Sequence, residues 1–458
     1  RGLIWLHTFG GGIDILERRT KRFTHFNHDP KDPTSLGSKQ IYTFFEDSAG
    51  TIWIGTDSGI SYYHPMWRKF RSRRLLVKAP YRESNQSVIR ILGSNIGRNE
   101  AGLLRHVWLG TEAGLNRWDR QKNRFHFFEV TPKTPDSQPY ALYEAPNQIL
   151  WVGTGMGLHR SIPISGSNPS IPVRFETVLP RITGGRGVIT AILPAIDGNL
   201  WIASYGLVLG YYNTTSNTVR YFSPEDEVKS ESARSRNLII TMVRGNRNRI
   251  WIISKDGLGQ FNPKTRQFIA NDKLSKQLAP YRIQSLHQSH SGVLWLGTME
   301  NGLLKYDPQQ DKLTCYSKQQ GMPSNRIQSI ISESDNHRNE ILWISTERGL
   351  SRFHSQTDQF DNFFASDGLQ GNEFNYGSVF RSDKGKIFFG GKNGFNIFMP
   401  NEIRKSRFTP PLMITELKVL NRSVHPGQAS LLKKVIHLTD HIRLSHSDKI
   451  ISFRFSAL

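Results

Sequence analysis

The sequence predicts an all-β protein of the β-propeller class, in which small antiparallel sheets stand radially around a central channel. Three observations lead to this prediction. An apolar phrase centred on an aromatic residue recurs along the chain, its copies lie 43 to 55 residues apart, and turn residues follow the copies. A repeat near this length is typical of propeller blades. The central residues are Trp5, Trp53, Trp108, Trp151, Trp201, Trp251, Trp295, Trp343 and Phe388.

The unit around Trp53 shows how one copy predicts one blade. Residues 41–45 and 60–63 are short aromatic and β-branched runs on either side of the phrase, so each is expected to form a strand. Residues 69–73 alternate basic and other side chains, as expected for a fourth, outer strand. The phrase itself is apolar on both faces, as a sheet packed between two others requires. We therefore expect it to be scaffold that carries no chemistry.

Two glycines of the unit have predicted structural roles. Gly55 follows the aromatic strand and would let neighbouring backbones approach closely. Gly59 lies in the next turn, where a positive φ angle suits a residue without a side chain. Most copies of the phrase carry glycines at the same two places, which supports one shared blade geometry.

Nine copies exceed the roughly four to eight blades that usually close a ring. We assign the seven copies from Trp108 to Phe388 to one ring, and the copies at Trp5 and Trp53 to the last blades of a preceding propeller. A single larger or open ring is the alternative, because two separate blades would expose a sheet face.

Beyond residue 400 the repeat stops. Residues 412–419, 442–444 and 450–455 then predict strands of a truncated β-sandwich, and the first unit begins at its second strand. Both ends of the sequence are thus expected to lie inside a structural unit. The predicted domains are residues 1–75, 76–407 and 408–458.

Charge and composition limit the classes of function. The formal net charge is +22, which favours anionic partners such as acidic glycans, nucleic acid or an anionic membrane surface. Basic clusters occur at residues 68–74, 244–249 and 404–407, although dispersed surface charge is the favoured explanation. The longest apolar run, residues 188–196, is far shorter than the roughly 18 residues of a membrane span. One cysteine, Cys315, excludes an internal disulfide and a cysteine-rich metal site.

The sequence carries no pattern that predicts catalysis. Asp47, Asp197, Glu333, Asp335 and Asp383 are available carboxylates, but most lie at the turn after a first strand, where a hydrogen-bonding residue is expected anyway. No phosphate-binding loop with a lysine, no nucleophile elbow and no HExxH motif is present. His287 and His290 lack a third metal ligand nearby. We therefore predict no catalytic residue, no metal and no cofactor.

Nucleic-acid binding is a further class that the charge allows. Residues 220–222 and 68–74 interleave basic and other side chains, aromatic ones in the first run, as a surface that stacks on bases could. Outer strands with exposed charges explain the same residues, so no nucleic-acid partner is predicted.

Residues 50–56 together with Gly59 resemble the two-component regulator propeller repeat. Residues 385–400, followed by Pro410 and Pro411, resemble the junction between the last such blade and a small sandwich called the Y-Y-Y domain, and residues 444–458 are similar to the first half of that domain. The resemblance covers nearly the whole chain.

This resemblance implies the periplasmic, ligand-sensing part of an inner-membrane signalling protein that acts as a homodimer. A membrane helix and a cytoplasmic output would follow, usually a histidine kinase, often a hybrid one, or else a diguanylate cyclase. Relatives in that family sense oligosaccharides. A propeller that degrades glycans is the enzymatic alternative.

We expect the ligand to bind on the loops that follow the aromatic strands, because the chain varies there. Aromatic and hydrogen-bonding side chains suit a sugar, and Arg348 and Lys392 suit a carboxylated or sulfated one. The predicted ligand-binding residues are Tyr205, Glu300, Asn301, Glu347, Arg348, Lys392 and Asn393.

Overall fold

The structure is a computed structural model that is almost entirely β, as predicted. Residues 68–403 form one compact unit, and residues 1–67 and 404–458 lie outside it. The structure describes residues 2–8, 10–28, 35–47, 50–63, 70–75, 86–94, 104–131, 135–162, 174–180, 187–205, 209–222, 239–255, 257–269, 271–334, 340–403, 412–428, 430–446 and 448–457.

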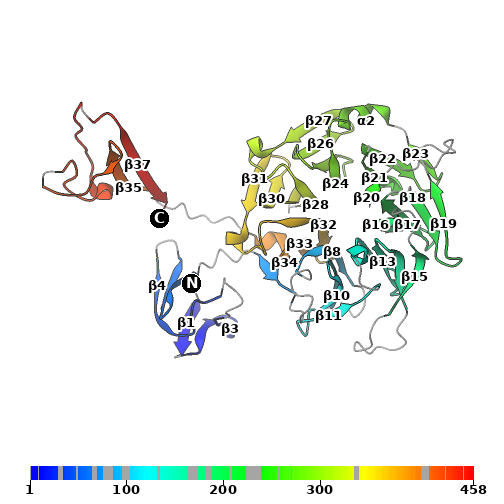
Figure 1. The fold of residues 1–458 in the computed structure, drawn as a ribbon, viewed down its shortest axis with the longest axis horizontal. Coiled ribbons are helices and arrows are strands. Elements are labelled where there is room, and N and C mark those ends of the chain that lie inside the picture. The colour runs from blue at the N-terminus through cyan, green and yellow to red at the C-terminus, as the bar shows by residue number, and fades with distance from the viewer. Residues whose placement is uncertain are drawn as a thin grey trace. The chain divides into compact units, whose positions relative to one another are not determined.

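Seven four-stranded antiparallel sheets of the described residues stand around a common centre, with the first strand of each sheet innermost (Figure 1). The first and second sheets contain β8 (Val88–Gly93), β9 (His106–Thr111), β10 (Gly114–Asp119) and β11 (Arg124–Phe128), then β12 (Ala141–Glu144), β13 (Leu150–Thr154), β14 (Gly157–Ser161) and β15 (Phe175–Pro180). The third and fourth contain β16 (Val188–Pro194), β17 (Leu200–Tyr205), β18 (Leu209–Asn213) and β19 (Thr218–Phe222), then β20 (Ile239–Arg244), β21 (Ile250–Ser254), β22 (Gly257–Asn262) and β23 (Gln267–Ile269).

The remaining three sheets complete the predicted seven-bladed propeller. The fifth and sixth contain β24 (Ile283–Gln288), β25 (Leu294–Thr298), β26 (Leu303–Asp307) and β27 (Lys312–Tyr316), then β28 (Ile327–Ser334), β29 (Glu340–Thr346), β30 (Gly349–His354) and β31 (Gln359–Phe363). The seventh contains β32 (Phe374–Arg381), β33 (Ile387–Gly391), β34 (Gly394–Phe398) and β7 (Arg71–Arg73).

The seventh sheet closes the ring with a strand from the other end of the sequence. Strand β7 pairs antiparallel with β34, so that Arg73 lies opposite Phe395. The prediction that residues 69–73 form the outer strand of the Trp53 unit is therefore wrong, because the alternating pattern identifies an edge strand but not its partner sheet. The predicted boundary after residue 75 consequently leaves a ring strand in the preceding domain. The alternative of one larger ring does not occur.

Direct contacts between the seventh and first sheets complete the closure. Ser378 Oγ donates to the Val88 carbonyl over 2.8 Å, and Asn375 Nδ2 donates to the same oxygen over 2.9 Å. Phe70, just before β7, is only 2% exposed and packs against Phe363 and Phe398 with ring centroids 5.1 and 4.9 Å apart. The closing segment is thus anchored by both hydrogen bonds and an aromatic cluster.

The aromatic phrase is scaffold within the ring, as predicted. Trp108, Trp295 and Trp343 are at most 2% exposed and lie in the cores between neighbouring sheets. A Cβ atom placed on Gly153 would come within 2.8 Å of the Ile189 carbonyl in the next sheet, which confirms the close approach of backbones. The turn glycine Gly114 has a φ angle of 138°, which confirms the second predicted role.

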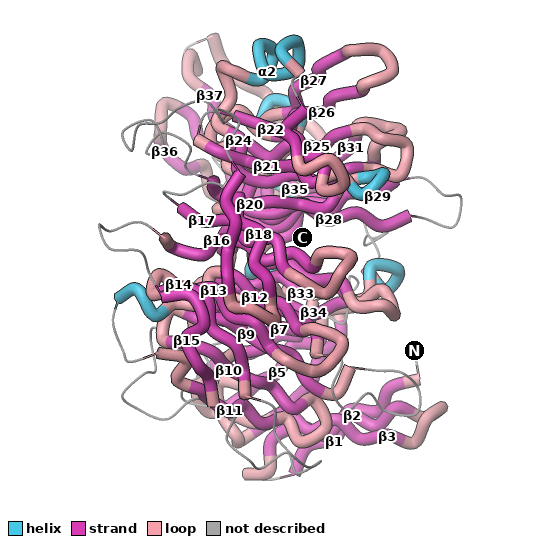
Figure 2. Tube along the Cα trace, turned by 90° about the vertical axis from the view of Figure 1, so that its right-hand side faces the viewer, coloured by secondary structure: helices cyan, strands magenta, loops and turns pink. Residues whose placement is uncertain are grey.

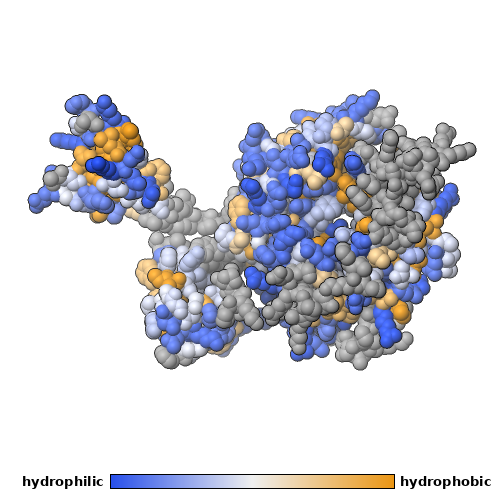
Figure 3. All heavy atoms as spheres, viewed as in Figure 1, coloured by the Kyte–Doolittle hydropathy of each residue, from blue (hydrophilic) through white to orange (hydrophobic). Residues whose placement is uncertain are grey.

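In the described part of the chain, one α-helix accompanies the strands that dominate Figure 2. Helix α2 (Asp272–Leu278) lies at the outer edge of the ring (Figure 1), where Leu274 and Leu278 are buried against the fourth and fifth sheets. Asn271 caps it by accepting from the Leu274 amide over 3.1 Å. On the ring face seen in Figure 3, hydrophilic side chains predominate and hydrophobic ones are scattered, as is normal for a protein surface.

Residues 1–67 contain two three-stranded sheets. Their strands are β1 (Leu3–Thr8), β2 (Gly12–Glu17), β3 (Arg22–Phe26), β4 (Ile41–Glu46), β5 (Ile52–Thr56) and β6 (Gly59–Tyr63). The two sheets pack on each other through Trp5 and Tyr63, whose ring centroids lie 5.1 Å apart. Trp53 is 40% exposed, unlike its counterparts in the ring, so the sheet face that two separate blades were expected to expose is present.

Beyond the ring, the described residues form one sheet of β35 (Leu412–Val419), β36 (Arg422–Ser423) and β37 (Ile451–Ala457). The strand predicted at residues 442–444 is absent. Ile442 instead packs, partly buried, against the small cluster around Leu417, so its apolar character reflects packing and not strand pairing. The assignment of this segment to a Y-Y-Y domain stays a prediction.

Candidate functional site

The order of strands in each sheet defines the two faces of the ring. Successive connections in an antiparallel sheet alternate between its two ends, so turns after first and third strands share one end and turns after second strands share the other. We call the end with the turns after second strands the 2–3 face, and the opposite end the 1–2 face. Six of the predicted ligand-binding residues follow a second strand, and Tyr205 is the last residue of one, so all seven belong to the 2–3 face.

The structure places the predicted residues in separate local contacts. Lys392 Nζ lies 3.3 Å from Glu112 Oε1, and Glu347 Oε2 lies 3.7 Å from Arg326 Nε. The other contacts are those of turns: the amide of Arg348 donates to Thr346 Oγ1, the amide of Asn393 donates to Gln370 Oε1, and the carbonyl of Asn301 accepts from Cys315 Sγ. Glu300 lies in the same turn as Asn301, and the side chain of Tyr205 is outside the described part of the chain. None of these described contacts joins two of the seven residues.

The 2–3 face also carries a cluster at the central channel that the sequence did not reveal. Arg90 of β8 donates from Nη1 to the Tyr376 carbonyl over 2.7 Å, and its guanidinium lies 5.6 Å from the centre of the Tyr376 ring. The side chain of Tyr376 lies beside that of Thr241, and burial raises the pKa of Tyr376 to about 12. Because Thr241 belongs to the fourth sheet and Tyr376 to the seventh, this tyrosine reaches across the channel.

An irregularity in β32 places this tyrosine. The register between β32 and β33 shifts between Phe374 and Val379, and Gly377 has a φ angle of 64°. The residues between them leave the regular strand and turn toward the channel. Tyr140, just before β12, interacts electrostatically with both Arg90 and Glu112. The channel cluster, defined as Arg90, Tyr140, Tyr376 and Glu112, combines phenol, guanidinium and carboxylate groups that can hydrogen-bond a sugar.

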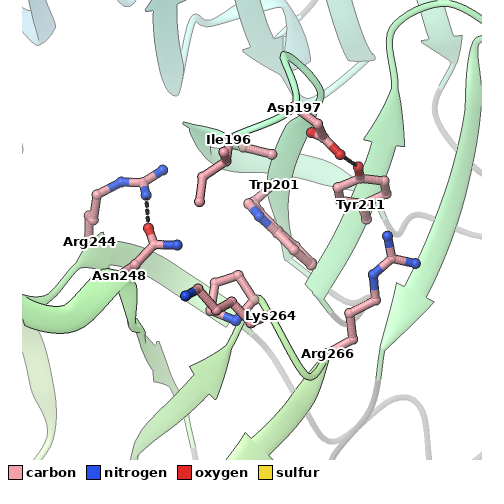
Figure 4. Close-up of a pocket in the computed structure, with 10 residues that line it drawn as sticks. Ile196, Asp197, Trp201, Tyr211, Arg244, Asn248, Lys264 and Arg266 are labelled. Carbon is pink, nitrogen blue, oxygen red and sulfur yellow. Dashed lines mark hydrogen bonds between the residues drawn. The ribbon is translucent and has the colours of Figure 1, made fainter.

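The 1–2 face holds a pocket of about 180 Å³ between the third and fourth sheets (Figure 4). Trp201 is buried at its base, and the Tyr211 hydroxyl donates to Asp197. Asn199 Nδ2 also donates to the Tyr211 oxygen over 2.9 Å. Although partial desolvation acts to raise it, the hydrogen bonds from Tyr211 and Asn199 hold the pKa of Asp197 below its usual range.

Basic side chains surround this pocket. Arg266 lies with its guanidinium carbon 5.0 Å from the centre of the Tyr211 ring. Arg244 donates to the Asn248 Oδ1 atom and to the Pro194 carbonyl, and Lys264 completes the basic set. Arg244 belongs to the basic cluster at residues 244–249 in the sequence, whereas the other two come from the turn before β23.

Other basic residues have a structural role, which accounts for part of the positive charge. Lys305 lies 5.3 Å from the Trp295 ring centre, and Arg352 lies 5.6 Å from that of Trp343. Arg352 also pairs with Asp361, whose Oδ2 atom is 2.8 Å from Nη2. Such stacked cations stabilise the blades and are not exposed for ligands.

Two of the carboxylates named from the sequence, Asp47 and Glu333, accept hydrogen bonds from tryptophans. Asp47 accepts from Trp53 Nε1 over 2.8 Å, and Glu333 accepts from Trp343 Nε1 over 2.9 Å. Burial raises the pKa of Glu333. Asp335 lies outside the described residues. Each of these two carboxylates therefore satisfies an indole donor, which is buried in Trp343 and partly exposed in Trp53.

Within the described ranges, no three His, Cys, Asp or Glu side chains gather closely enough to hold a metal ion. His287 lies 3.3 Å from Glu340, which also accepts from Trp295 Nε1 over 3.0 Å. Among the residues that the structure describes, no helix combines the length and apolar character needed to cross a membrane.

Comparisons with known proteins identify relatives among signalling proteins. Residues 35–58 match the two component regulator propeller family. Histidine kinase P4 of Formosa agariphila is 23% identical over 270 residues, a match that covers 57% of this chain and 19% of the kinase. The chain therefore corresponds to only a small part of that kinase.

Solved structures share the fold. A structure described as the extracellular domain of a hybrid two component system from B. thetaiotaomicron matches with a TM-score of 0.54 and 20% identity, over 100% of this chain and 58% of its own. A streptogramin B lyase matches with a TM-score of 0.50 and 13% identity, over 73% of this chain and 99% of the lyase. These likenesses confirm the β-propeller fold.

Proposed function

We propose that this chain is the periplasmic ligand-sensing region of a bacterial inner-membrane signalling protein, a sensor histidine kinase of the hybrid type. Two findings taken together support the proposal. Residues 35–58 match the regulator propeller family, and the fold matches, over the whole chain, an extracellular domain described as part of a hybrid two component system. In this proposal the chain binds a ligand, forms a homodimer in the complete protein and performs no turnover itself.

The proposed ligand is an oligosaccharide that enters at the channel cluster on the 2–3 face. Tyr140 and Tyr376 supply aromatic surface, and Arg90 and Glu112 supply hydrogen-bonding groups of both kinds. Glu112 also accepts from Ser87 Oγ over 2.7 Å, which fixes its position beside Lys392. The predicted residue Lys392 would therefore act together with Glu112 at the edge of this site.

Calorimetric titration of the chain against a panel of neutral and acidic oligosaccharides tests this proposal. We expect at least one member of the panel to bind without being degraded. Degradation of a glycan would instead support a propeller enzyme, the alternative suggested by the fold that is shared with a lyase. In the complete protein, autophosphorylation with ATP supports a kinase output, and formation of a cyclic dinucleotide from GTP supports a diguanylate cyclase.

Replacing Tyr376 with phenylalanine is expected to weaken binding of the identified oligosaccharide by roughly fivefold to tenfold. The change removes the hydroxyl that reaches across the channel, and one hydrogen bond contributes about 1 kcal/mol. The matched control is Tyr306→Phe, because the Tyr306 hydroxyl donates to Asp311 over 3.0 Å in a turn on the 1–2 face. Equal dissociation constants for wild type and Tyr376→Phe would place the ligand elsewhere.

A further inference from the structure

Among the residues that line the pocket on the 1–2 face, three cations, Arg244, Lys264 and Arg266, stand against one carboxylate, Asp197, so the net charge is positive. Among the described residues, Arg244, Lys264 and Arg266 form no ion pair, whereas Lys392 on the opposite face pairs with Glu112. The carboxylate that lines the pocket, Asp197, already accepts hydrogen bonds from Tyr211 and from the amide of Asn199. The electrostatic potential at the pocket therefore favours binding of an anion.

An unused donor lies in the same pocket. Asn248 accepts from Arg244 through Oδ1, which leaves its amide nitrogen as a donor (Figure 4). That Nδ2 atom is buried and has no hydrogen-bond partner among the described residues. A buried donor without a partner costs about 1 to 3 kcal/mol, so an acceptor supplied by a ligand would be favourable here.

The backbone at Arg266 is a second, independent sign of a site. Arg266 occupies the left-handed region with a φ angle of 58°, at the turn position that directly precedes the outer strand. The same position in other sheets of the ring holds residues that adopt this region more readily. They are Asn123, Asn217, Asp311 and Asp358, with φ angles of 49° to 55°.

Residues at this turn position in other sheets accept hydrogen bonds from a neighbouring tyrosine, and the fourth sheet has no such donor. Asn217 accepts from the Tyr212 hydroxyl over 2.8 Å, and Asp311 accepts from Tyr306. The matching residue of the fourth sheet is Phe261, which has no donor to satisfy. The fourth sheet thus carries an arginine at a φ angle that asparagine adopts more easily, as Lys21 does before β3, and the Arg266 guanidinium lies beside Tyr211 at the pocket (Figure 4).

We propose that this pocket binds an oxyanion, a carboxylate or a sulfate, either as a free ion or as the acidic group of a sugar. Arg244, Lys264, Arg266 and the Asn248 amide would donate to its oxygens. Ile196, which is 80% exposed, and Pro263 offer apolar surface for the rest of a small ligand. At about 180 Å³ the pocket is smaller than the roughly 300 to 1,000 Å³ of most ligand sites, so it takes one acidic unit and not a chain.

Titration of the whole chain with inorganic sulfate, glucuronate and glucose tests the proposal. We expect sulfate or glucuronate to bind and glucose not to bind. Similar affinities for the two anions indicate a free oxyanion as ligand, and an affinity for glucuronate at least tenfold higher indicates an acidic sugar. Absence of binding by both anions overturns the proposal, whatever the channel cluster binds.

Two variants assign the anion to this pocket. Arg266→Asn places in the turn the residue that Asn123 and Asn217 already show to be compatible with it, so the fold is expected to persist. We expect this variant and Arg244→Gln each to weaken anion binding at least tenfold. The control is Lys122→Gln, which removes an exposed cation from the equivalent turn of the first sheet. An equal loss in Lys122→Gln, or a loss in Arg90→Gln alone, overturns the assignment.

Discussion

Replacing Phe70 with alanine is expected to lower the free energy of unfolding of the ring by about 3 to 5 kcal/mol, the usual cost of emptying a buried aromatic position. Phe70 is 2% exposed and lies edge-on against Trp343, Phe363 and Phe398. It precedes β7, which has only three residues and supplies the outer strand of the seventh sheet. Loss of this anchor should therefore weaken the closure of the ring as well as its core.

Chemical denaturation of the chain, followed by tryptophan fluorescence, measures this loss. Phe23→Ala is the matched control, because Phe23 is 62% exposed and its removal should change stability by less than about 0.5 kcal/mol. Hydrogen exchange adds a local readout, since the amides of β34 and β7 should lose protection first in Phe70→Ala. If Phe70→Ala is as mild as Phe23→Ala, β7 does not hold the ring closed.

The repeat predicted the individual strands because its signals are local. In the second sheet, β13 ends at Thr154 and β14 begins at Gly157, as the phrase and its turn glycine indicate. The partner of β7 could not be predicted in the same way, since Arg73 and Phe395 are far apart in the sequence. Pairing between distant segments depends on which sheet lacks an outer strand, and only the closed ring shows that.

The candidate sites were harder to predict for a related reason. The loops after second strands were identified from topology, and the structure adds the channel cluster, whose Tyr376 depends on a local departure of β32 from regular pairing. The pocket on the 1–2 face joins turns of two sheets, so no single stretch of sequence contains it. One signal was available: Arg266 stands in a turn position where four other hairpins of the ring have asparagine or aspartate.

Acidification from pH 7.5 to pH 5.0 is expected to cost the ring about 2 kcal/mol of stability through His159 alone. This histidine in β14 is fully buried, and desolvation lowers its pKa to about 4. Its Nε2 atom lies 2.8 Å from Thr154 Oγ1, and its Nδ1 atom lies 3.0 Å from Thr177 Oγ1. In the unfolded chain the pKa returns to about 6.5. Between these two values the unfolded state binds more protons than the folded state, so stability falls as the pH falls.

Urea denaturation at the two pH values, compared between wild type and His159→Gln, isolates this contribution. The variant keeps a hydrogen-bonding side chain but cannot titrate, so its loss of stability between pH 7.5 and 5.0 should be smaller than that of wild type by about 2 kcal/mol. Its lower stability at neutral pH does not affect that difference. His126→Gln, at an exposed position of β11, should retain the wild-type pH dependence. A His159→Gln variant that loses as much stability on acidification as wild type would show that the destabilisation arises from other groups.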